Sequence, residues 1–495
     1  MLNHLTKSCF ILGAILGLAG THASAQDVKP LQQAQGRPNI VFFITDDYGW
    51  QDTSEPMWTE QTELNRIFRT PNMERLADQG VKFTNAYTAC SVCAASRISI
   101  LTGQNPVRHG TTFITGKHGY GKNSKTLKSA KQDIEGIQQG DILLPALLKE
   151  AGYRTICIGK AHFGIGFSAD PLNLGFDRKH YANASGSPIG RRFGGRDPYH
   201  VKRDGEQVHL SEALTLDAKK EIDEAVKEQK PFFLYLSHYA IHGPIIEDKR
   251  FSQNYPDLDE KTRAYATLVE GADKSLGDVM DHIEKLGIAK DTLLIWTADN
   301  GGLRSNAPMK GLKNDAYEGG HRVPNMVAWG AQDETRAHQK RMPLKPGRVD
   351  NRPYIHQDWM PTLLSLAGTT HPKPELLDGY DITGLLSGNE QDVRPDLFYW
   401  HEPNFWLRSG PESSIREGKW KLIYFYAKGK WNKKGWQLFD LEADIGEKNN
   451  LLREFPEISD RLARKLMKHL EDNKANYPTD IKSGAEQPPV LPSSI

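Results

Sequence analysis

The chain has 495 residues, of which 38% are hydrophobic and 25% are charged, the composition of a folded globular protein. Lysine and arginine number 63 against 62 for aspartate and glutamate, which gives a formal net charge of +1. No global positive field therefore favours nucleic acid or an anionic membrane surface. Any preference for anions must come from a local site, and we expect no nucleic-acid partner.

Residues 1–25 have the three parts of a cleaved secretory signal. Lys7 precedes the apolar run 9–19, and Ala23-Ser24-Ala25 fits an Ala-x-Ala cleavage site. The apolar run is too short to span a bilayer comfortably, and no later segment is long enough. The sequence therefore predicts an exported protein, periplasmic or secreted, without a membrane span.

Four continuous apolar runs predict buried parallel strands, because strands that are covered on both faces do not alternate. The runs are 40–44, 155–158, 232–236 and 293–296. Helical patterns are found at 70–80, 142–150, 262–286 and 355–366. The alternation of strands and helices predicts an α/β fold with a large, mostly parallel sheet sandwiched by helices.

The composition of the sequence changes after residue 374, where aromatic, polar and turn-forming residues become frequent. Strand patterns at 398–400 and 420–424 predict a smaller antiparallel sheet, followed by a helix at 456–473. We therefore expect a signal peptide (1–25), a main domain (26–374), a C-terminal subdomain (375–476) and a polar, proline-bearing tail (477–495).

Each predicted strand of the main domain is followed by polar residues that can bind or react. In chain order they are Asp46-Asp47, Lys160 and His162, His238 and His242, and Asp299-Asn300. Ligands of open α/β sheets bind outside the carboxyl ends of the strands, so these side chains should meet at one edge. Turn and capping chemistry explains any single pair more easily than it explains all four.

Oxygen ligands dominate this set, since Asp46, Asp47, Asp299 and Asn300 offer nothing else. Such ligands favour a hard cation, Ca²⁺ with Mg²⁺ as the alternative, over zinc. Without a cation, three carboxylates would repel one another and raise at least one pKa. The two histidines after the third strand have a zinc-like spacing of four, but they lack the glutamate of a metalloprotease motif.

The segment Cys93-Ala94-Ala95-Ser96-Arg97, followed by Leu101-Thr102-Gly103, resembles the signature of type I, formylglycine-dependent sulfatases of the alkaline phosphatase superfamily. Further family elements follow in order between about residues 38 and 451. They are 39–49, 159–162, 231–244, 298–302, 310–324, 416–422 and 438–441. The alternative is a buried free cysteine at the start of a helix. The resemblance makes 26–374 the catalytic domain of a sulfuric ester hydrolase.

The resemblance also implies that Cys93 is oxidised to formylglycine, whose hydrated aldehyde is the nucleophile and a ligand of the metal. Arg97 would stabilise the alkoxide form of that hydrate. Ala95 stands where many family members have proline, which is similar to substrates of the anaerobic, radical type of maturation enzyme. Cys90 and Cys157 either pair or remain separate buried thiols, and we expect separate thiols.

The remaining roles come from the same resemblance. His242 would protonate the leaving oxygen, and Lys313 would hold the sulfate. His162, positioned by Lys160, would take the proton in the second step. Lys160, His242 and Lys313 would thus also bind substrate, although either lysine could instead be a solvated surface residue. Further candidates for the substrate pocket are His109, Arg304 and His401.

Taken together, the sequence predicts hydrolysis of sulfate esters on a sulfated polysaccharide or oligosaccharide. Export, a neutral surface and an aromatic C-terminal part favour such a carbohydrate over a small aryl sulfate. Its partners would be that carbohydrate and a formylglycine-generating maturation enzyme. One alternative is a phosphonate or phosphate diester hydrolase of the same superfamily. The other is a catalytically silent protein that binds sulfated glycans.

Overall fold

A computed structural model describes residues 36–116, 123–391, 394–405, 407–430 and 432–494. The signal peptide expected at 1–25 lies outside the described residues. Within them, every helix is too short or too polar to cross a lipid bilayer.

The four apolar runs form the centre of the main sheet. They are β1 (Asn39–Thr45), β4 (Arg154–Gly159), β8 (Phe232–Ser237) and β9 (Thr292–Ala298), and every residue in them is buried. β1 pairs in parallel with both β8 and β9, and β8 pairs in parallel with β4. Burial on both faces explains why these strands are continuously apolar.

Shorter strands extend the sheet to the order β11-β2-β10-β9-β1-β8-β4-β5, with β12 also paired to β2. These strands are β2 (Val81–Tyr87), β5 (Arg178–His180), β10 (Arg322–Trp329), β11 (Arg348–Asp350) and β12 (Tyr354–Ile355). β10 runs antiparallel to both of its neighbours, and the other pairings are parallel. The predicted large, mostly parallel sheet is confirmed.

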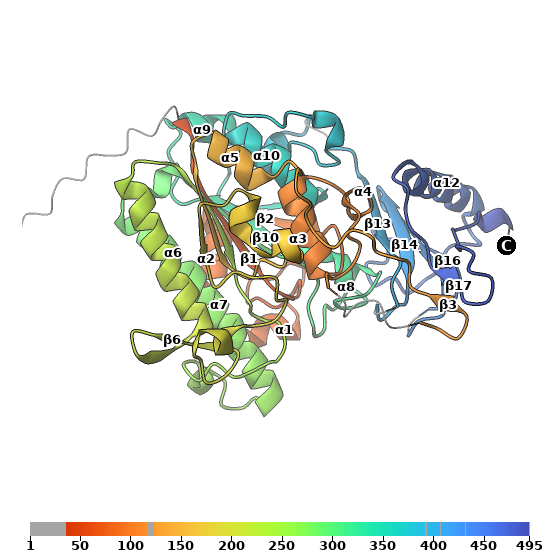
Figure 1. Ribbon diagram of the computed structural model, residues 1–495, viewed down its shortest axis with the longest axis horizontal. Coiled ribbons are helices and arrows are strands. Elements are labelled where there is room, and N and C mark those ends of the chain that lie inside the picture. Colours follow the sequence, from red (N-terminus) through yellow and green to blue (C-terminus); the bar gives the residue numbers. More distant parts are fainter. Residues whose placement is uncertain (1–35, 117–122, 392–393, 406, 431, 495) are drawn as a thin grey trace, which may run out of the picture. The chain divides into compact units, whose positions relative to one another are not determined.

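Two groups of helices flank this sheet (Figure 1). One group comprises α2 (Pro71–Gln79), α6 (Leu210–Lys227) and α7 (Glu260–Lys285). The other comprises α3 (Cys93–Thr102), α5 (Leu144–Glu150) and α10 (Trp359–Leu366). Members of each group pack against one another, so that both faces of the sheet are covered.

The helix expected at 355–366 begins later than its sequence pattern indicates. Tyr354 and Ile355 pair with β2, and residues 356–358 form a turn of 3₁₀ helix before α10. The Asp358 carboxylate accepts a hydrogen bond from the Ile355 amide at 2.9 Å, which holds this turn. The tertiary pairing with β2 therefore overrides the helical pattern at these residues.

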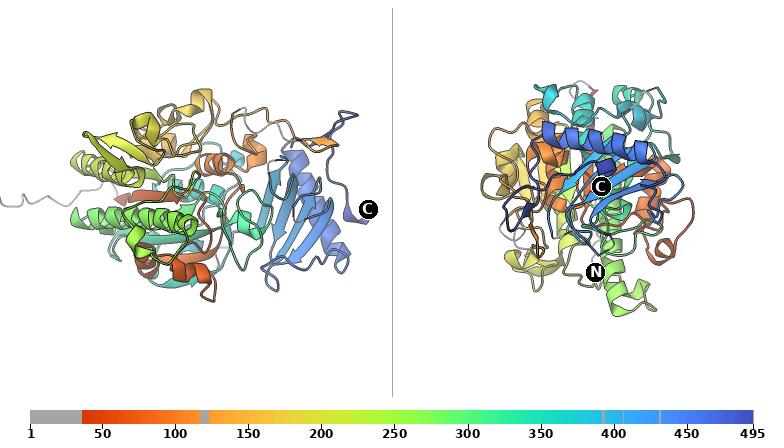
Figure 2. Two further views of the ribbon diagram at one scale, coloured as in Figure 1. Left: turned by 90° about the horizontal axis from the view of Figure 1, so that it is seen from below. Right: turned by 90° about the vertical axis from the view of Figure 1, so that its right-hand side faces the viewer.

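A smaller antiparallel sheet follows in the C-terminal part, as predicted. Its strands are β13 (Leu397–Glu402), β14 (Glu412–Glu417), β15 (Trp420–Phe425) and β16 (Gly435–Asp440), paired in that order. α12 (Pro456–Asp472) lies across one face of this sheet (Figure 2). Its residues Leu462, Leu466 and Leu470 are buried against Ile415 and Leu422.

The described part of the expected tail, residues 477–494, packs against other parts of the chain. β17 (Thr479–Asp480) pairs with β3 (Leu127–Lys128), and the indole N–H of Trp436 donates to the Val490 carbonyl at 2.7 Å. Leu491 also packs against the core under α12. The predicted tail therefore packs specifically although its composition is polar. The predicted domain boundaries remain predictions.

A buried ion-pair network ties α6 to the edge of the sheet and should make stability depend on pH. Glu221 accepts from Arg154 Nη2 at 2.5 Å and lies 2.7 Å from His180 Nε2. Burial alone would raise the pKa of Glu221, but His180 and Arg154 lower it from 4.5 to about 2. Its stabilisation is therefore complete above pH 4.5 and is lost as the pH falls toward 2.

We expect Glu221→Gln to lower the free energy of unfolding by about 2–3 kcal/mol at pH 7, and by less than half of that at pH 3. Urea unfolding of both proteins at the two pH values measures this difference. Glu224→Gln, on the same helix but with a half-exposed side chain whose ion pair with Lys227 is long at 3.9 Å, should change it by less than about 0.5 kcal/mol at either pH. A Glu221→Gln effect that is equal at both pH values would contradict this assignment.

Candidate active site

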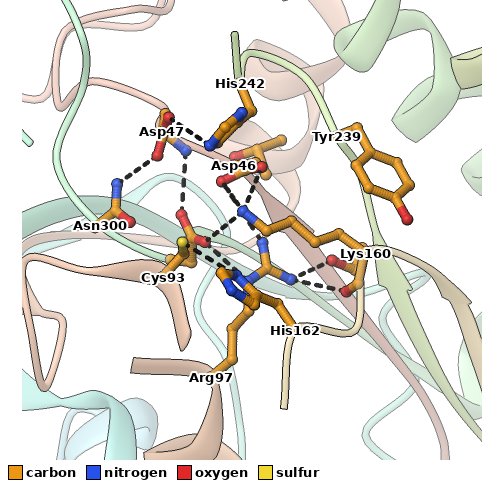
Figure 3. Close-up of polar contacts among 12 residues, drawn as sticks. Asp46, Asp47, Cys93, Arg97, Lys160, His162, Tyr239, His242 and Asn300 are labelled. Carbon is orange, nitrogen blue, oxygen red and sulfur yellow. Dashed lines mark hydrogen bonds and ion pairs between the residues drawn. The ribbon is translucent and has the colours of Figure 1, made fainter. Parts of the chain in front are cut away.

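The carboxyl ends of β1, β4, β8 and β9 gather the predicted metal-binding and catalytic side chains at one edge of the sheet (Figure 3). α3 and the loop after β9 contribute the others. The residues in contact there are Asp46, Asp47, Cys93, Arg97, Lys160, His162, His242, Asp299, Asn300 and Lys313. The edge thus combines carboxylates, cations and imidazoles in a buried place.

Asp46 and Asp299 are fully buried and are held by two cations. Lys160 Nζ lies 2.7 Å from both carboxylate oxygens of Asp46 and 3.9 Å from Asp299 Oδ2. Arg97 Nε donates to Asp299 Oδ2 at 2.8 Å, and Arg97 Nη2 lies 4.0 Å from Asp46 Oδ1. The four groups therefore form one ion-pair network with no exposure to solvent.

Asp47 is bound by three groups from different parts of the chain. Lys313 Nζ lies 2.5 Å from its Oδ1, Asn300 Nδ2 donates to the same oxygen at 2.9 Å, and His242 Nε2 lies 4.0 Å from Oδ2. Burial alone would raise the pKa of Asp47, but Lys313 and His242 hold it well below its usual range. Asp47 is therefore ionised and keeps Lys313 in place.

Cys93 is the first residue of α3, and it is only 2% exposed. Its Sγ lies 3.3 Å from His162 Nδ1, and Arg97 follows one helical turn later on the same helix. All ten residues of α3 are buried, so the helix holds residue 93 rigidly beside the carboxylates. The N-terminus of a helix also favours a bound anion.

Backbone strain marks two residues of this edge. Asp47 and His162 have φ angles of 57° and 54°, a backbone conformation that residues with a Cβ adopt rarely. Such strained residues cluster at functional sites, where the surrounding structure holds them in place. Here the strain places the two side chains against Lys313 and Cys93, respectively.

The donor set of this edge fits a hard divalent cation. Asp46, Cys93 and Asp299 each offer a donor atom within 4.8 Å of the others. Asn300 Oδ1 is buried and has no hydrogen-bond partner in the part of the chain that the structure describes, which leaves an amide oxygen free for a metal. Burial raises the pKa of Asp46 well above its usual range, Lys160 opposes the rise, and the two neighbouring carboxylates add to it. A cation among these oxygens would relieve that repulsion.

Both histidines of the cluster are held in the neutral form. Burial lowers the pKa of His162 well below its usual range, and Lys160 and Arg97 lower it further. Burial also lowers the pKa of His242 to about 3, although Asp47 opposes the shift. His242 Nδ1 donates to the Gly243 carbonyl at 2.8 Å, so the lone pair lies on Nε2, the atom that faces Asp47.

Models of known protein families match this sequence and show which family the chain belongs to. The model described as "Sulfatase" matches residues 38–369, and the model described as "N-sulphoglucosamine sulphohydrolase, C-terminal" matches residues 313–476. The chain belongs to the sulfatase family. It is thus a sulfuric ester hydrolase, and the family implies a metal and a formylglycine.

Similar proteins share most of their length with this sulfatase. The N-acetylgalactosamine-6-sulfatase of Mus musculus is 30% identical over 73% of this chain and 68% of its own. A sulfatase of Formosa agariphila is 28% identical over 93% of this chain and 92% of its own. The crystal structure of Ps i-CgsB in complex with k-i-k-neocarrahexaose has a TM-score of 0.71 at 25% identity, over 88% of this chain and 93% of that one.

The three further residues predicted for the substrate pocket contact residues outside the active-site cluster. His109 bonds Ser99 at 3.0 Å and accepts from the Thr111 amide, so it uses both ring nitrogens between α3 and the following turn. His401 likewise uses both, on Ser413 and the Asn476 carbonyl. Arg304 donates to Thr262 at 3.1 Å and lies over the ring of Tyr265. A substrate-binding role for His109, Arg304 and His401 remains a prediction.

The other cysteines and His238 stand apart from the reactive cluster. Cys90, Cys93 and Cys157 are all buried free thiols, in agreement with the expectation of separate thiols. His238 bonds Ser275 at 2.9 Å and stacks on Phe43, so it packs behind the strand.

Two residues that sequence reasoning missed hold the reactive segment. Ser237, the last residue of β8, accepts a hydrogen bond from Arg97 Nη1. Glu402 of β13 accepts from the Ser91 amide at 2.6 Å and also from the Ser91 hydroxyl, two residues before Cys93. The position of Ser237 at a strand end was a usable signal. Glu402 carried none, because it lies 311 residues from Ser91 in the chain.

Proposed function

We propose that this sulfatase removes sulfate from a sulfated polysaccharide or oligosaccharide, through a formylglycine made from Cys93 and a divalent cation. The observation that carries the proposal is the position of Cys93, 3.3 Å from His162 and beside the carboxylates of Asp46 and Asp299. A buried thiol would gain nothing from three carboxylates, two lysines and two histidines around it. An oxygen nucleophile at residue 93 would use all of them.

The substrate class is supported by the names of similar proteins. The mouse and human relatives are N-acetylgalactosamine-6-sulfatases, and one similar solved structure holds k-i-k-neocarrahexaose. Both names refer to sugars. Together with the aromatic C-terminal part, they favour sulfated galactose-type sugars, such as algal galactans or glycosaminoglycans.

Asp46, Asp47, Asp299 and the free amide oxygen of Asn300 would hold the cation, which we take to be Ca²⁺, with Mg²⁺ as the alternative. A bound divalent cation supplies positive charge that polarises a sulfate ester and favours an ionised oxygen nucleophile. Arg97 fixes Asp299 through the 2.8 Å ion pair and places its own charge beside residue 93. Arg97 Nη2, 4.0 Å from Asp46 Oδ1, has no hydrogen-bond partner among the described residues, so its N–H groups can stabilise negative charge there.

Lys313 and His242 would act on the substrate. Lys313 Nζ is fixed by Asp47 and keeps further N–H donors for the sulfate oxygens. A bound sulfate ester would add negative charge beside His242 and so raise its pKa, which would let Nε2 take up the proton that the leaving oxygen needs. Asp47, 4.0 Å away, would stabilise the imidazolium once it forms.

His162 and Lys160 would act on residue 93. His162 Nδ1, 3.3 Å from Cys93 Sγ, would accept a proton from a hydroxyl group at this position. Lys160 raises the cost of charging His162, which keeps the imidazole a neutral base between turnovers. Its own charge would help to orient a sulfate ester beside Asp46.

We also propose that the protein is exported and that Cys93 is converted by a radical-type maturation enzyme. The signal-like residues 1–25 support export, and Ala95 supports the type of maturation enzyme. Because Cys93 is 2% exposed and α3 is buried along its whole length, conversion has to precede folding.

Comparing sulfate esters with phosphate diesters tests the proposed reaction. The matured protein is incubated with chondroitin sulfate and carrageenan oligosaccharides, and in parallel with bis-4-nitrophenyl phosphate. We expect release of inorganic sulfate, with a higher kcat/KM than for the phosphate diester. Faster cleavage of the phosphate diester would favour the phosphodiesterase alternative. Binding without release, by protein in which residue 93 is still a thiol, would favour the silent glycan-binding protein.

Removal of the metal should abolish activity. After treatment with a chelator, we expect sulfate release to fall to background and to return on addition of Ca²⁺ or Mg²⁺, because the carboxylates then regain their counter-charge. Asn300→Ala should raise the metal concentration for half-maximal reactivation about tenfold or more. Asn173→Ala, at an exposed position, is the matched control and should not change it. Full activity after exhaustive chelation would contradict a metal-dependent reaction.

A further inference from the structure

A second buried cluster of possible metal ligands lies outside the active site. It consists of His321, the last residue of α8 (Glu318–His321), Glu402 on β13 and Glu412 on β14 (Figure 1). Each of the three offers a donor atom within 4.8 Å of the others. Their exposed fractions are 0%, 1% and 0%, so solvent reaches none of them.

The members of this cluster differ in how their polar atoms are satisfied. Glu402 accepts from the amide and the hydroxyl of Ser91, and its Oε1 lies 2.9 Å from His321 Nε2. Among the described residues, neither carboxylate oxygen of Glu412 has a hydrogen-bond partner, and His321 Nδ1 has none either. Three strong acceptor atoms are thus left open inside this part of the protein.

No basic side chain of the described residues forms an ion pair with Glu412. Lys421, the lysine whose charge acts on it, is used by Glu318 and Glu447 at 3.0 and 3.1 Å. A buried carboxylate without a cationic partner is strongly destabilising, so a metal ion or a proton must neutralise it. A proton would occupy only one of these open acceptor atoms, whereas His321, Glu402 and Glu412 each place one donor atom within 4.8 Å of the other two, the separation at which one metal ion can bind all three residues.

We propose that Glu412, His321 and Glu402 form a second metal site that binds a divalent transition metal ion, and that this ion is zinc. An imidazole combined with carboxylates suits zinc, whereas calcium and magnesium prefer oxygen ligands alone. The donor set therefore differs in kind from the all-oxygen protein ligands Asp46, Asp47, Asp299 and Asn300.

The proposed metal site lies between the main sheet and the C-terminal sheet, where it would have a structural role. Glu402 and Glu412 belong to the C-terminal sheet, while His321 leads directly into β10 of the main sheet. Glu402 in turn holds Ser91, two residues before Cys93. A metal ion here would fasten the C-terminal sheet to the main sheet and fix the segment that presents Cys93.

Metal analysis of the intact protein tests the proposal. The full chain is produced in zinc-containing medium, and its metal content is measured by mass spectrometry after gel filtration. X-ray anomalous difference maps at the zinc edge then locate the ion. We expect about one zinc per chain, with a peak between His321 and Glu412. Wild-type protein without zinc, or with its only zinc peak at Asp46 and Asp47, would overturn the proposal.

Variants provide the matched comparison. Glu412→Gln keeps the shape of the side chain but removes the charge, and it should lose the zinc and lower Tm. Glu417→Gln lies on the same strand, is partly exposed to solvent, and should keep the zinc. If Glu412 were instead protonated, Glu412→Gln would match the wild type in both metal content and Tm, which would also overturn the proposal. Neither readout uses sulfate release, so failure here is separate from failure of the proposed function.

Discussion

Replacing Cys93 with alanine should lower sulfate release by on the order of 10⁴-fold or more, because the variant retains binding groups but has no nucleophile. Among the described residues, the hydrogen bond of the Cys93 thiol is the one with His162, so removal of the thiol costs little stability. The substitution therefore separates the loss of chemistry from the loss of fold. Initial rates on a sulfated oligosaccharide, with Tm measured alongside, give the comparison.

Cys157→Ala is the matched control for this result. Cys157 is also a fully buried free thiol, but it lies within β4 and not among the side chains that follow the carboxyl end of that strand. We expect it to keep most of the activity. Equal activity of Cys93→Ala and the wild type would contradict the proposed role of Cys93.

Replacing Arg97 with alanine should lower the free energy of unfolding by about 3–5 kcal/mol, since it leaves a buried carboxylate without its partner. Arg97 is fully buried, pairs with Asp299 at 2.8 Å, and also donates to the Lys160 carbonyl at 3.0 Å. Urea unfolding in the presence of a chelator measures the effect, because then only protein charges balance the carboxylates.

Arg75→Ala provides the contrast for this prediction. Arg75 also bridges two acidic residues, Asp281 and Glu284, at 2.6 and 3.0 Å, but these carboxylates are 67% and 62% exposed. An exposed pair contributes about 1 kcal/mol at most. Losses of similar size for the two variants would show that burial does not set the strength of the Arg97 network.

The sequence predicts the central strands of the fold and most of the active-site cluster, because both follow from how a buried parallel sheet is built. Strands that are buried on both faces are continuously apolar, so β1, β4, β8 and β9 stand out as runs. Parallel strands deliver the residues that follow them to a common edge. The aspartates, lysines and histidines directly after such runs are therefore expected to lie together on the strength of the sequence alone.

Features that depend on tertiary contacts are absent from these patterns. β10 contains Pro324, which argues against a central strand, and the register with β2 shifts between Val323 and Asn325 beside it. His109 and His401 have suitable side chains for a sulfate pocket, but their ring nitrogens are already used by neighbours. The hydrogen bond from the Ser91 amide to Glu402 joins the segment before α3 to the C-terminal sheet, which no local pattern can indicate.

The central claim is that residue 93 is no longer a cysteine in the working enzyme. The most direct measurement is the mass of the proteolytic peptide that contains residue 93, from protein produced with a radical-type maturation enzyme and without it. We predict the mass of an aldehyde at this residue only in the first case, together with sulfate release only in the first case. Sulfate release by protein whose residue 93 is entirely thiol would contradict the account.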